Sequence, residues 1–224
     1  MKYASKKTIA VVLLVLLSTS PPRFGVALEF NNGYISGNIK SKTWKDLRDE
    51  RVIKQEFDDS CGAASLATIL SKFYGQPVSE QNIISALMDN GVNGSASFAS
   101  LSVVAEQYGF SGRGLALRLE KLKEIKVPVI VYMKYKGTKD HFAVLRGISK
   151  DIVWLADPST GNRYLTKHQF LELWETREDD DLRGKVLLIM PQNLDSPPPM
   201  DSAFFQEPKP RSLPVRMLTM TLGN

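Results

Sequence analysis

Hydrophobic periodicity changes once along this 224-residue chain, close to Gly109. Before that glycine, apolar residues recur near the 3.6-residue spacing of α-helices, in the segments 61–74, 80–89 and 98–108. Beyond it the chain forms short segments. Some alternate between polar and apolar residues and others are apolar throughout, as in β-strands. Helices followed by strands predict an α+β domain, in which N-terminal helices pack on a mostly antiparallel sheet.

Residues that commonly begin and end helices flank these three segments. Ser79 and Ser97 stand directly before the second and third segments, where a hydroxyl oxygen can accept a hydrogen bond from a free backbone N–H. Gly75, Gly91 and Gly109 follow the three segments, and glycine often ends a helix because it adopts left-handed backbone at little cost.

The strand-like part of the chain divides into short segments separated by turn residues. A tight turn at 150–151 joins two of them as an antiparallel pair. We expect strands at 113–117, 127–135, 139–149, 151–157, 161–166 and 184–190, with short helices at 119–125 and 167–174.

The first 27 residues have the parts of a secretory signal peptide: a basic start, an apolar run from Ile9 to Leu17, and small residues up to Ala27. The alternative is a retained membrane anchor, but nine strongly apolar residues are fewer than the roughly 20 that span a bilayer. We therefore expect cleavage after Ala27, export to the periplasm, and no stable membrane anchor in the mature protein.

The basic charge of the chain comes mostly from this leader. The formal net charge of the whole chain is +5, and the leader holds four of the 29 basic residues and none of the 24 acidic ones. Without it the net charge is +1. We expect no nucleic-acid partner, because no basic stripe with interleaved aromatic residues remains to neutralise phosphates.

Cys61 is the only cysteine, so it cannot form an internal disulfide. One interpretation is a small buried apolar side chain, which is the common state of a free cysteine. The other is a reactive thiol. Cys61 follows the polar segment 55–60 and begins the first helix, where a thiol near a base ionises more readily. Gly62 and Ala63 leave room for a substrate to approach.

A reactive thiol needs a base, and the chain has two histidines. His141 begins the apolar strand "HFAVL", and we expect it to be the proton acceptor and later donor. His168 lies in the first turn of an expected helix among polar residues, and we expect it to be exposed to solvent.

Two further residues fit the same chemistry. Asp157 ends the strand 151–157, and in a hairpin it returns near the level of His141, where its carboxylate could orient the imidazole. The alternative for Asp157 and the following proline is a turn that ends a strand. Gln55 precedes Cys61 by six residues, and its side-chain amide could bind an oxyanion together with the Cys61 backbone N–H.

The order Gln55, Cys61, His141, Asp157 is similar to that of papain-like cysteine peptidases. The segments "DDSCGAASLATIL", "HFAVLRGI" and "WLADPSTGNRYLTKHQF" resemble more closely the double-glycine peptidases that remove leader peptides from bacteriocins. This resemblance implies a papain-like fold, with Cys61 as nucleophile, His141 as general base, Asp157 as its orienting group and Gln55 as oxyanion donor.

The resemblance covers about residues 50–190. The expected organisation is a signal peptide at 1–27, an N-terminal extension at 28–49, a double-glycine-peptidase-like domain at 50–190, and a Pro-rich, flexible tail at 191–224.

The function that the resemblance implies is that of an exported cysteine endopeptidase, which cleaves a secreted or periplasmic client protein after small residues such as Gly-Gly. Family members are usually fused to an exporter and work on its cytoplasmic side. Stand-alone exported members resemble proteins encoded beside functional-amyloid secretion systems. The expected partner is therefore a peptide or protein substrate, such as an amyloid subunit or a component of its export apparatus.

Two alternatives remain open. One is a chaperone or escort that binds an extended client segment in the same cleft without cutting it. The other is acyl transfer to an amine, or cleavage of cell-wall peptides. No cofactor is expected, because the chain has no phosphate-binding glycine loop, and its two histidines and one cysteine are too scattered to bind a metal.

Overall fold

A computed structural model describes residues 27–31, 36–40, 43–135, 140–193 and 200–205. The chain divides into two compact units, residues 1–43 and residues 44–224. In the first unit, β1 (Ala27–Asn31) pairs with β2 (Ser36–Lys40) in an antiparallel hairpin. The predicted signal peptide lies outside the described residues except for its last residue.

The second unit contains the helices expected from the sequence. Ser79 and Ser97 each accept a hydrogen bond from the third residue of the helix that follows, so both predicted N-terminal caps are confirmed. Thr166 caps a later helix in the same way. The helices are α1 (Trp44–Arg48), α2 (Cys61–Thr68), the π-helix η1 (Ile69–Phe73), α3 (Glu80–Asp89), α4 (Phe98–Gln107), α5 (Leu119–Leu122), α6 (Lys167–Trp174) and the 3₁₀-helix η2 (Ser202–Phe205).

The strands of this unit form one six-stranded sheet in the order β3-β8-β4-β5-β6-β7. Every neighbouring pair is antiparallel, which confirms the predicted α+β class. The strands are β3 (Phe110–Leu117), β4 (Val129–Lys134), β5 (Asp140–Ile148), β6 (Ile152–Asp157), β7 (Gly161–Thr166) and β8 (Gly184–Pro191).

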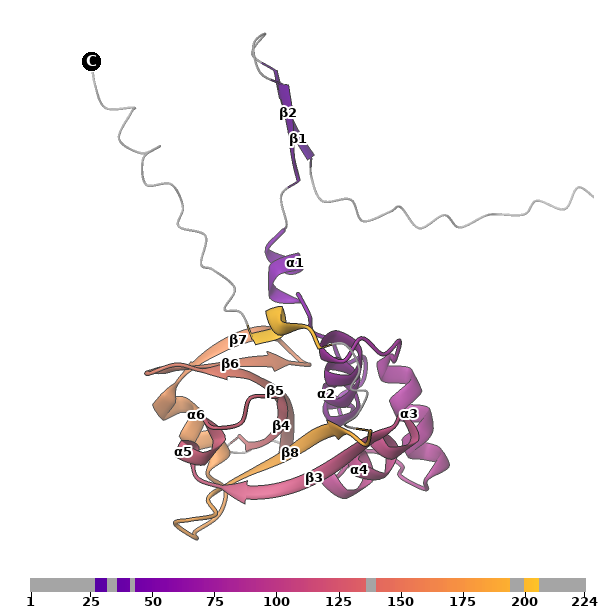
Figure 1. Cartoon of the computed structure of the whole chain (residues 1–224), viewed down its shortest axis with the longest axis vertical. Helices are drawn as coiled ribbons and strands as arrows, with labels where there is room; N and C mark the ends of the chain where they lie inside the picture. The colour runs from indigo at the N-terminus through magenta and orange to yellow at the C-terminus, as the bar shows by residue number, and fades with distance from the viewer. Residues whose placement is uncertain (1–26, 32–35, 41–42, 136–139, 194–199, 206–224) are drawn as a thin grey trace, which may run out of the picture. The chain divides into compact units, whose positions relative to one another are not determined.

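The sheet is buried on both faces because its strands send apolar side chains alternately into two cores. On β5, Phe142 and Val144 lie in one core, and Ala143 and Leu145 lie in the other. Helices α2, α3 and α4 cover the first face, and α5 and α6 cover the second (Figure 1). Burial on both faces explains why several strand sequences are apolar almost throughout.

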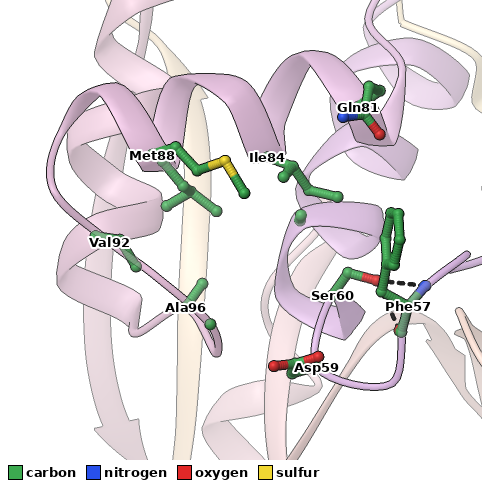
Figure 2. Close-up of a pocket in the computed structure, with 11 residues that line it drawn as sticks. Phe57, Asp59, Ser60, Gln81, Ile84, Met88, Val92 and Ala96 are labelled. Carbon is green, nitrogen blue, oxygen red and sulfur yellow. Dashed lines mark hydrogen bonds between the residues drawn. The ribbon is translucent and has the colours of Figure 1, made fainter.

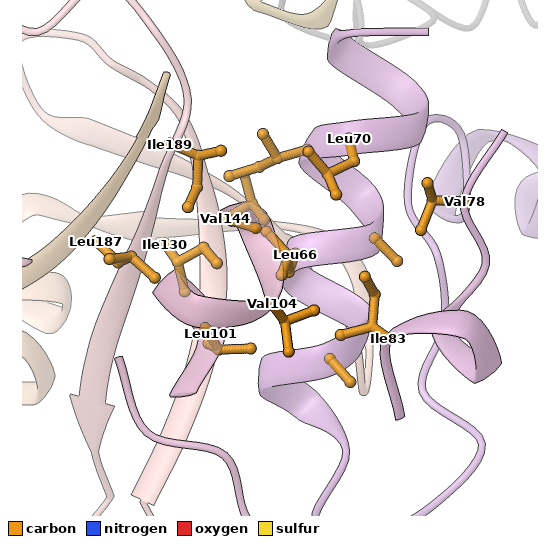
Figure 3. Close-up of a cluster of buried hydrophobic side chains, with 14 of the residues drawn as sticks. Leu66, Leu70, Val78, Ile83, Leu101, Val104, Ile130, Val144, Leu187 and Ile189 are labelled. Atoms are coloured by element: carbon orange, nitrogen blue, oxygen red, sulfur yellow. The ribbon is translucent and has the colours of Figure 1, made fainter. Parts of the chain in front are cut away.

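The first core joins the helices to the sheet, and Figure 3 shows side chains of α2 and α4 meeting those of the strands. Leu66 of α2 and Leu101 of α4 have no solvent exposure, and neither has Val144 of β5. Helix α2 is therefore held firmly against β5, which fixes the position of its first residue relative to the strand.

One segment inside the predicted flexible tail packs on this unit. Phe204 of η2 is fully buried against Phe73, and its carbonyl oxygen accepts a hydrogen bond from Arg146 Nε over 2.6 Å. Asp201 forms an ion pair with Arg51 at 2.6 Å. Residues 194–199 and 206–224 of the tail lie outside the described residues.

Candidate active site

Cys61 is the first residue of α2 and lines a cleft of about 650 Å³. Cys61 is only 7% exposed, which agrees with the interpretation of a buried apolar side chain, yet it lines this cleft. The rings of Phe98 and Phe142 lie tilted against each other in the cleft wall, with centroids 5.2 Å apart, and Asp58 and Lys185 also line the cleft. The thiol is therefore packed from behind by the core and accessible from the cleft.

The N-terminus of α2 keeps its first backbone N–H groups available. Ser60 occupies the N-cap position, but its hydroxyl bonds to the backbone N–H and carbonyl of Phe57 and does not cap the helix. The first N–H groups of a helix have no partner within the helix, and they favour negative charge nearby. A developing oxyanion beside Cys61 would find such donors.

His141 lies near the start of β5 and contacts both Cys61 and Asp157. Its Nε2 is 3.2 Å from Asp157 Oδ2, and its side chain forms hydrogen bonds with Asp157 and with the Cys61 thiol. Because Nε2 faces the carboxylate, Nδ1 is the ring nitrogen left for the sulfur. Burial disfavours the charged imidazolium, but the hydrogen bonds and charges of Asp157 and Cys61 outweigh it and raise the pKa of His141 to about 9.

Asp157 is the last residue of β6 and is 1% exposed. Its Oδ1 accepts hydrogen bonds from the backbone N–H groups of Ser159 and Thr160, at 2.8 and 3.1 Å. Burial raises its pKa, but the hydrogen bond and charge of His141 and these backbone donors outweigh it, and the pKa falls to about 2. The carboxylate is therefore ionised and fixed in orientation.

Gln55 lies in the loop before α2, and its amide is held on both sides. Its Nε2 donates to the carbonyl oxygens of Phe57 and Asp58, at 2.7 and 3.3 Å. Its Oε1 accepts the hydroxyl hydrogen of Ser159 over 2.6 Å. Carbonyl oxygens only accept, so this pattern fixes which amide atom is the nitrogen. The predicted oxyanion role of Gln55 stays a prediction.

His168 is far from this arrangement. Its side chain is 83% exposed on α6, and its ion-pair partner is Glu172, one turn further along the same helix. The expectation that His168 lies in solvent is confirmed.

Two residues that the sequence analysis did not identify complete the surroundings of His141. Arg163 Nη1 lies 3.2 Å from Asp157 Oδ2 and 2.9 Å from the hydroxyl of Tyr135. The Tyr135 ring meets the His141 ring edge to face, with centroids 5.8 Å apart. A sequence signal for Arg163 existed: it follows Asp157 by six residues across the turn between β6 and β7, on the neighbouring strand.

A second hollow, of about 260 Å³, lies beside the cleft between the N-terminus of α2 and helix α3 (Figure 2). Ile84, Met88 and Val92 form its apolar side, and Phe57 and Ala96 border it (Figure 2). Met88 is 56% exposed. The hollow gives the cleft an apolar neighbour of the kind that binds apolar side chains.

Within the described residues, no cluster of three or more histidine, cysteine, aspartate or glutamate side chains could hold a metal ion. None of the described helices is long and apolar enough to cross a membrane.

The arrangement of Cys61, His141 and Asp157 has a defined chemical capacity. A thiol bonded to an imidazole can pass its proton to the ring and act as a nucleophile. A carboxylate on the other ring nitrogen holds the tautomer and stabilises the imidazolium.

Comparison with known proteins gives consistent matches. Residues 49–177 match the peptidase C39 family. The chain is 32% identical over 174 residues to the "Probable functional amyloid protease FapD" of Pseudomonas fluorescens, covering 74% of this chain and 75% of the relative. A protein of the same name from Pseudomonas aeruginosa is 29% identical over 197 residues, covering 86% of this chain and 82% of the relative.

A solved structure agrees in fold. A double glycine motif protease from an AMS/PCAT transporter, crystallised in complex with the leader peptide, superposes with a TM-score of 0.50 and 28% sequence identity. The match covers 62% of this chain and 90% of that protease. This likeness confirms the predicted papain-like fold of the double-glycine peptidases.

Proposed function

This chain belongs to the peptidase C39 family, and from that membership we propose that it is an exported cysteine endopeptidase with Cys61 as nucleophile, His141 as general base and Asp157 as the orienting group. The observation that carries the proposal is the position of His141, which bonds to the thiol on one side and to a buried, ionised carboxylate on the other. A cysteine that served only as core packing would not need this arrangement.

The proposed reaction begins with transfer of the Cys61 thiol proton to His141. The Sγ thiolate attacks the carbonyl carbon of the scissile peptide bond, and the negative charge moves to the carbonyl oxygen. The Cys61 backbone N–H stabilises that oxygen, and Gln55 Nε2 joins it by releasing the Asp58 carbonyl, the longer of its two present contacts. The C–N bond breaks as His141 gives its proton to the leaving amine, which leaves a thioester on Cys61.

Water completes the cycle. His141 takes a proton from a water molecule, whose oxygen attacks the thioester carbonyl carbon. The C–S bond breaks, the new carboxylic acid leaves, and Cys61 regains its proton from His141. No cofactor is needed for this hydrolysis.

The proposed client is a secreted or periplasmic protein of a functional-amyloid system, cut after small residues such as Gly-Gly. The names of the two Pseudomonas relatives, each a probable functional amyloid protease, support the amyloid assignment. The aromatic wall of the cleft supports small residues at the scissile bond, because Phe98 and Phe142 occupy space near Cys61 that a large side chain would need. The sequence pattern of a signal peptide supports the periplasmic location.

The test compares the N-terminal sequences of exported proteins from host cells that produce either the wild-type chain or Cys61→Ala. We expect at least one N-terminus that follows a small residue to be present with the wild type and absent with Cys61→Ala. His168→Ala is the control, because His168 is exposed and remote from Cys61. Identical N-termini with the wild type and Cys61→Ala would refute the peptidase proposal.

Thiol labelling separates cleavage from simple binding. Iodoacetamide should alkylate Cys61 rapidly at pH 6 in the wild type and slowly in His141→Ala, because only an activated thiol is ionised at that pH. An unreactive Cys61 in a protein that still binds its client would favour the non-cleaving escort instead.

A further inference from the structure

Four side chains from four neighbouring parts of the sheet form a closed ring of contacts. Tyr135 directly follows β4, His141 lies on β5, Asp157 ends β6 and Arg163 lies on β7. Each contacts the next, and Arg163 returns to Tyr135. The proposed base therefore stands within a cycle that includes a cation.

The central atom of this ring is Asp157 Oδ2. It lies 3.2 Å from His141 Nε2 and 3.2 Å from Arg163 Nη1. The same Nη1 lies 2.9 Å from the Tyr135 hydroxyl, so Tyr135 fixes the guanidinium in place. One carboxylate oxygen thus serves two donors, and its negative charge is shared between them.

Burial makes this sharing effective. The side chain of Asp157 is 1% exposed, that of His141 14% and that of Arg163 29%. Water therefore screens the charges weakly, and the charge of the Arg163 guanidinium influences the His141 imidazole over a short distance with little water between them. Arg163 favours an ionised Asp157, but its positive charge disfavours a proton on His141.

We propose that Arg163 is a positioning residue that holds Asp157 Oδ2 against His141 and, by sharing that oxygen, allows the imidazolium to release its proton to the leaving amine. This inference rests on the proposed function, because it concerns the proton that His141 carries in the reaction. Tyr135 supports it by anchoring the guanidinium and by packing its ring on the imidazole.

The physical reason for this role is that His141 must release its proton to the leaving amine as a general acid. A general acid works best when its pKa is near the operating pH, because a proton held too firmly is released slowly. The pKa of His141 is already raised to about 9 by Asp157 and Cys61, against the effect of burial. Without Arg163, Asp157 would bind the imidazolium alone, and the pKa of His141 would rise further.

Two other charged groups lie near this ring. Lys54, in the loop before α2, interacts electrostatically with Asp157 and with Asp49. Asp140, next to His141 in the chain, forms a hydrogen bond with Tyr132 on β4. The charged and titratable groups around His141 are therefore Cys61, Asp157, Arg163, Tyr135, Lys54 and Asp140. Of the cations among them, Arg163 is in direct contact with Asp157.

The experiment is an NMR titration of the histidine rings in the full chain. The chain has two histidines, so His168→Gln assigns the His141 signals. In Arg163→Gln we expect the titration midpoint of His141 to move up by roughly 0.5–1 pH unit, and kcat to fall about ten-fold with little change in KM. Arg163→Lys keeps the charge, so its midpoint should stay near that of the wild type.

Two further variants complete the test. Tyr135→Phe keeps the ring and removes the hydroxyl that anchors Arg163, so it should shift the midpoint upward by less than Arg163→Gln does. It also keeps the proposal testable if Arg163→Gln does not fold. Arg113→Gln is the matched control, because Arg113 is exposed on the edge strand β3, and it should change neither value.

The results that would overturn the role of Arg163 differ from those that would refute the proposed peptidase function. A midpoint that is unchanged or lower in Arg163→Gln overturns the inference, and so does an unchanged midpoint in Tyr135→Phe if Arg163→Gln is unfolded. The midpoints require no peptidase activity, so they stand even if the wild type cuts nothing. A wild type without His141-dependent thiol reactivity would refute the proposed function instead.

Discussion

Ser159 donates its hydroxyl hydrogen to Gln55 Oε1 over 2.6 Å, and this bond joins two segments that are distant in the sequence. The backbone N–H of Gln55 also donates to the carbonyl oxygen of Pro158, at 3.0 Å. The turn after β6 therefore holds both the Asp157 carboxylate and the loop that leads to Cys61. One short turn sets the position of the imidazole and of the proposed oxyanion donor together.

The first prediction concerns this hydrogen bond. In Ser159→Ala, the Gln55 amide loses the partner of its oxygen, so its nitrogen, the proposed oxyanion donor, is less well fixed. We expect kcat for peptide cleavage to fall about three- to ten-fold with KM nearly unchanged, since an ordinary hydrogen bond contributes about 1 kcal/mol and this one acts in the transition state.

Two variants control this measurement. Ser159→Thr keeps the hydroxyl and should retain most of the activity. Ser149→Ala removes a hydroxyl from the neighbouring turn between β5 and β6 and should have no effect on cleavage. An increase of KM alone in Ser159→Ala would contradict the proposed role, because it would indicate lost substrate binding.

The second prediction concerns the charge of Asp157. Asp157→Asn keeps an oxygen that can accept from His141 but removes the negative charge that favours the imidazolium. The alkaline limb of the pH profile of kcat/KM, expected near pH 9 in the wild type, should therefore move to lower pH. Steady-state rates between pH 5 and 10 measure this shift.

The direction of that shift is diagnostic. Arg163→Gln should move the same limb upward, because it removes a cation and not an anion. Opposite shifts in the two variants are expected if both side chains act on His141 through charge. Shifts in the same direction would mean that one of the variants acts by disturbing the local fold.

The third prediction concerns stability against pH. The folded-state pKa of His141, about 9, lies above its ordinary value of 6.5, so folding favours the protonated ring. The stability gained from this should be fully present below pH 6.5 and lost as the pH rises through about 9. The free energy of unfolding should fall by roughly 1–3 kcal/mol over that window.

Urea unfolding at pH 6 and pH 9.5 measures this loss, and His141→Gln should show much less of it. His168→Gln is the control, since its ring is exposed, and it should lose as much stability as the wild type. Asp157 affects the stability at acidic pH. Its pKa of about 2 lies below the ordinary 3.8, so its contribution is present above pH 3.8 and is lost as the pH falls through about 2.

The sequence predicted the helices well because their signals are local. Ser79, Ser97 and Thr166 cap their helices within three residues, and such bonds need no knowledge of the rest of the fold. The contact between His141 and Asp157 could also be predicted from the sequence, because a tight turn joins their strands and brings the two ends to the same level.

The parts that escaped prediction depend on contacts between distant segments. Arg163 and Tyr135 meet only because β7 and β4 lie on either side of the β5–β6 pair, and the sequence does not state that order. The pairing of β8 between β3 and β4 likewise joins segments far apart in the chain. The change from α- to π-helix at Ile69 has no sequence signal that we recognise.

The burial of Phe204 could not be predicted from the residues around it in the sequence. It lies in a region rich in proline and polar residues, which typically stays extended, so composition alone predicted a flexible tail. The buried site depends on Arg146, which has no opposite strand partner because it lies in a β-bulge between Leu145 and Gly147. Its guanidinium reaches the Phe204 carbonyl and stacks on the ring at 4.8 Å.

The last prediction follows from this anchor. Phe204→Ala removes a fully buried ring that packs on Phe73, and it leaves the Arg146 guanidinium without its aromatic neighbour. The free energy of unfolding should fall by about 3 kcal/mol, as for other buried phenylalanines. Met200→Ala is the control, because Met200 is 53% exposed in the same part of the tail, and it should change the stability little. Thermal unfolding followed by circular dichroism measures both. A Phe204→Ala variant as stable as the wild type would mean that the segment 201–205 does not hold its place against the domain in solution.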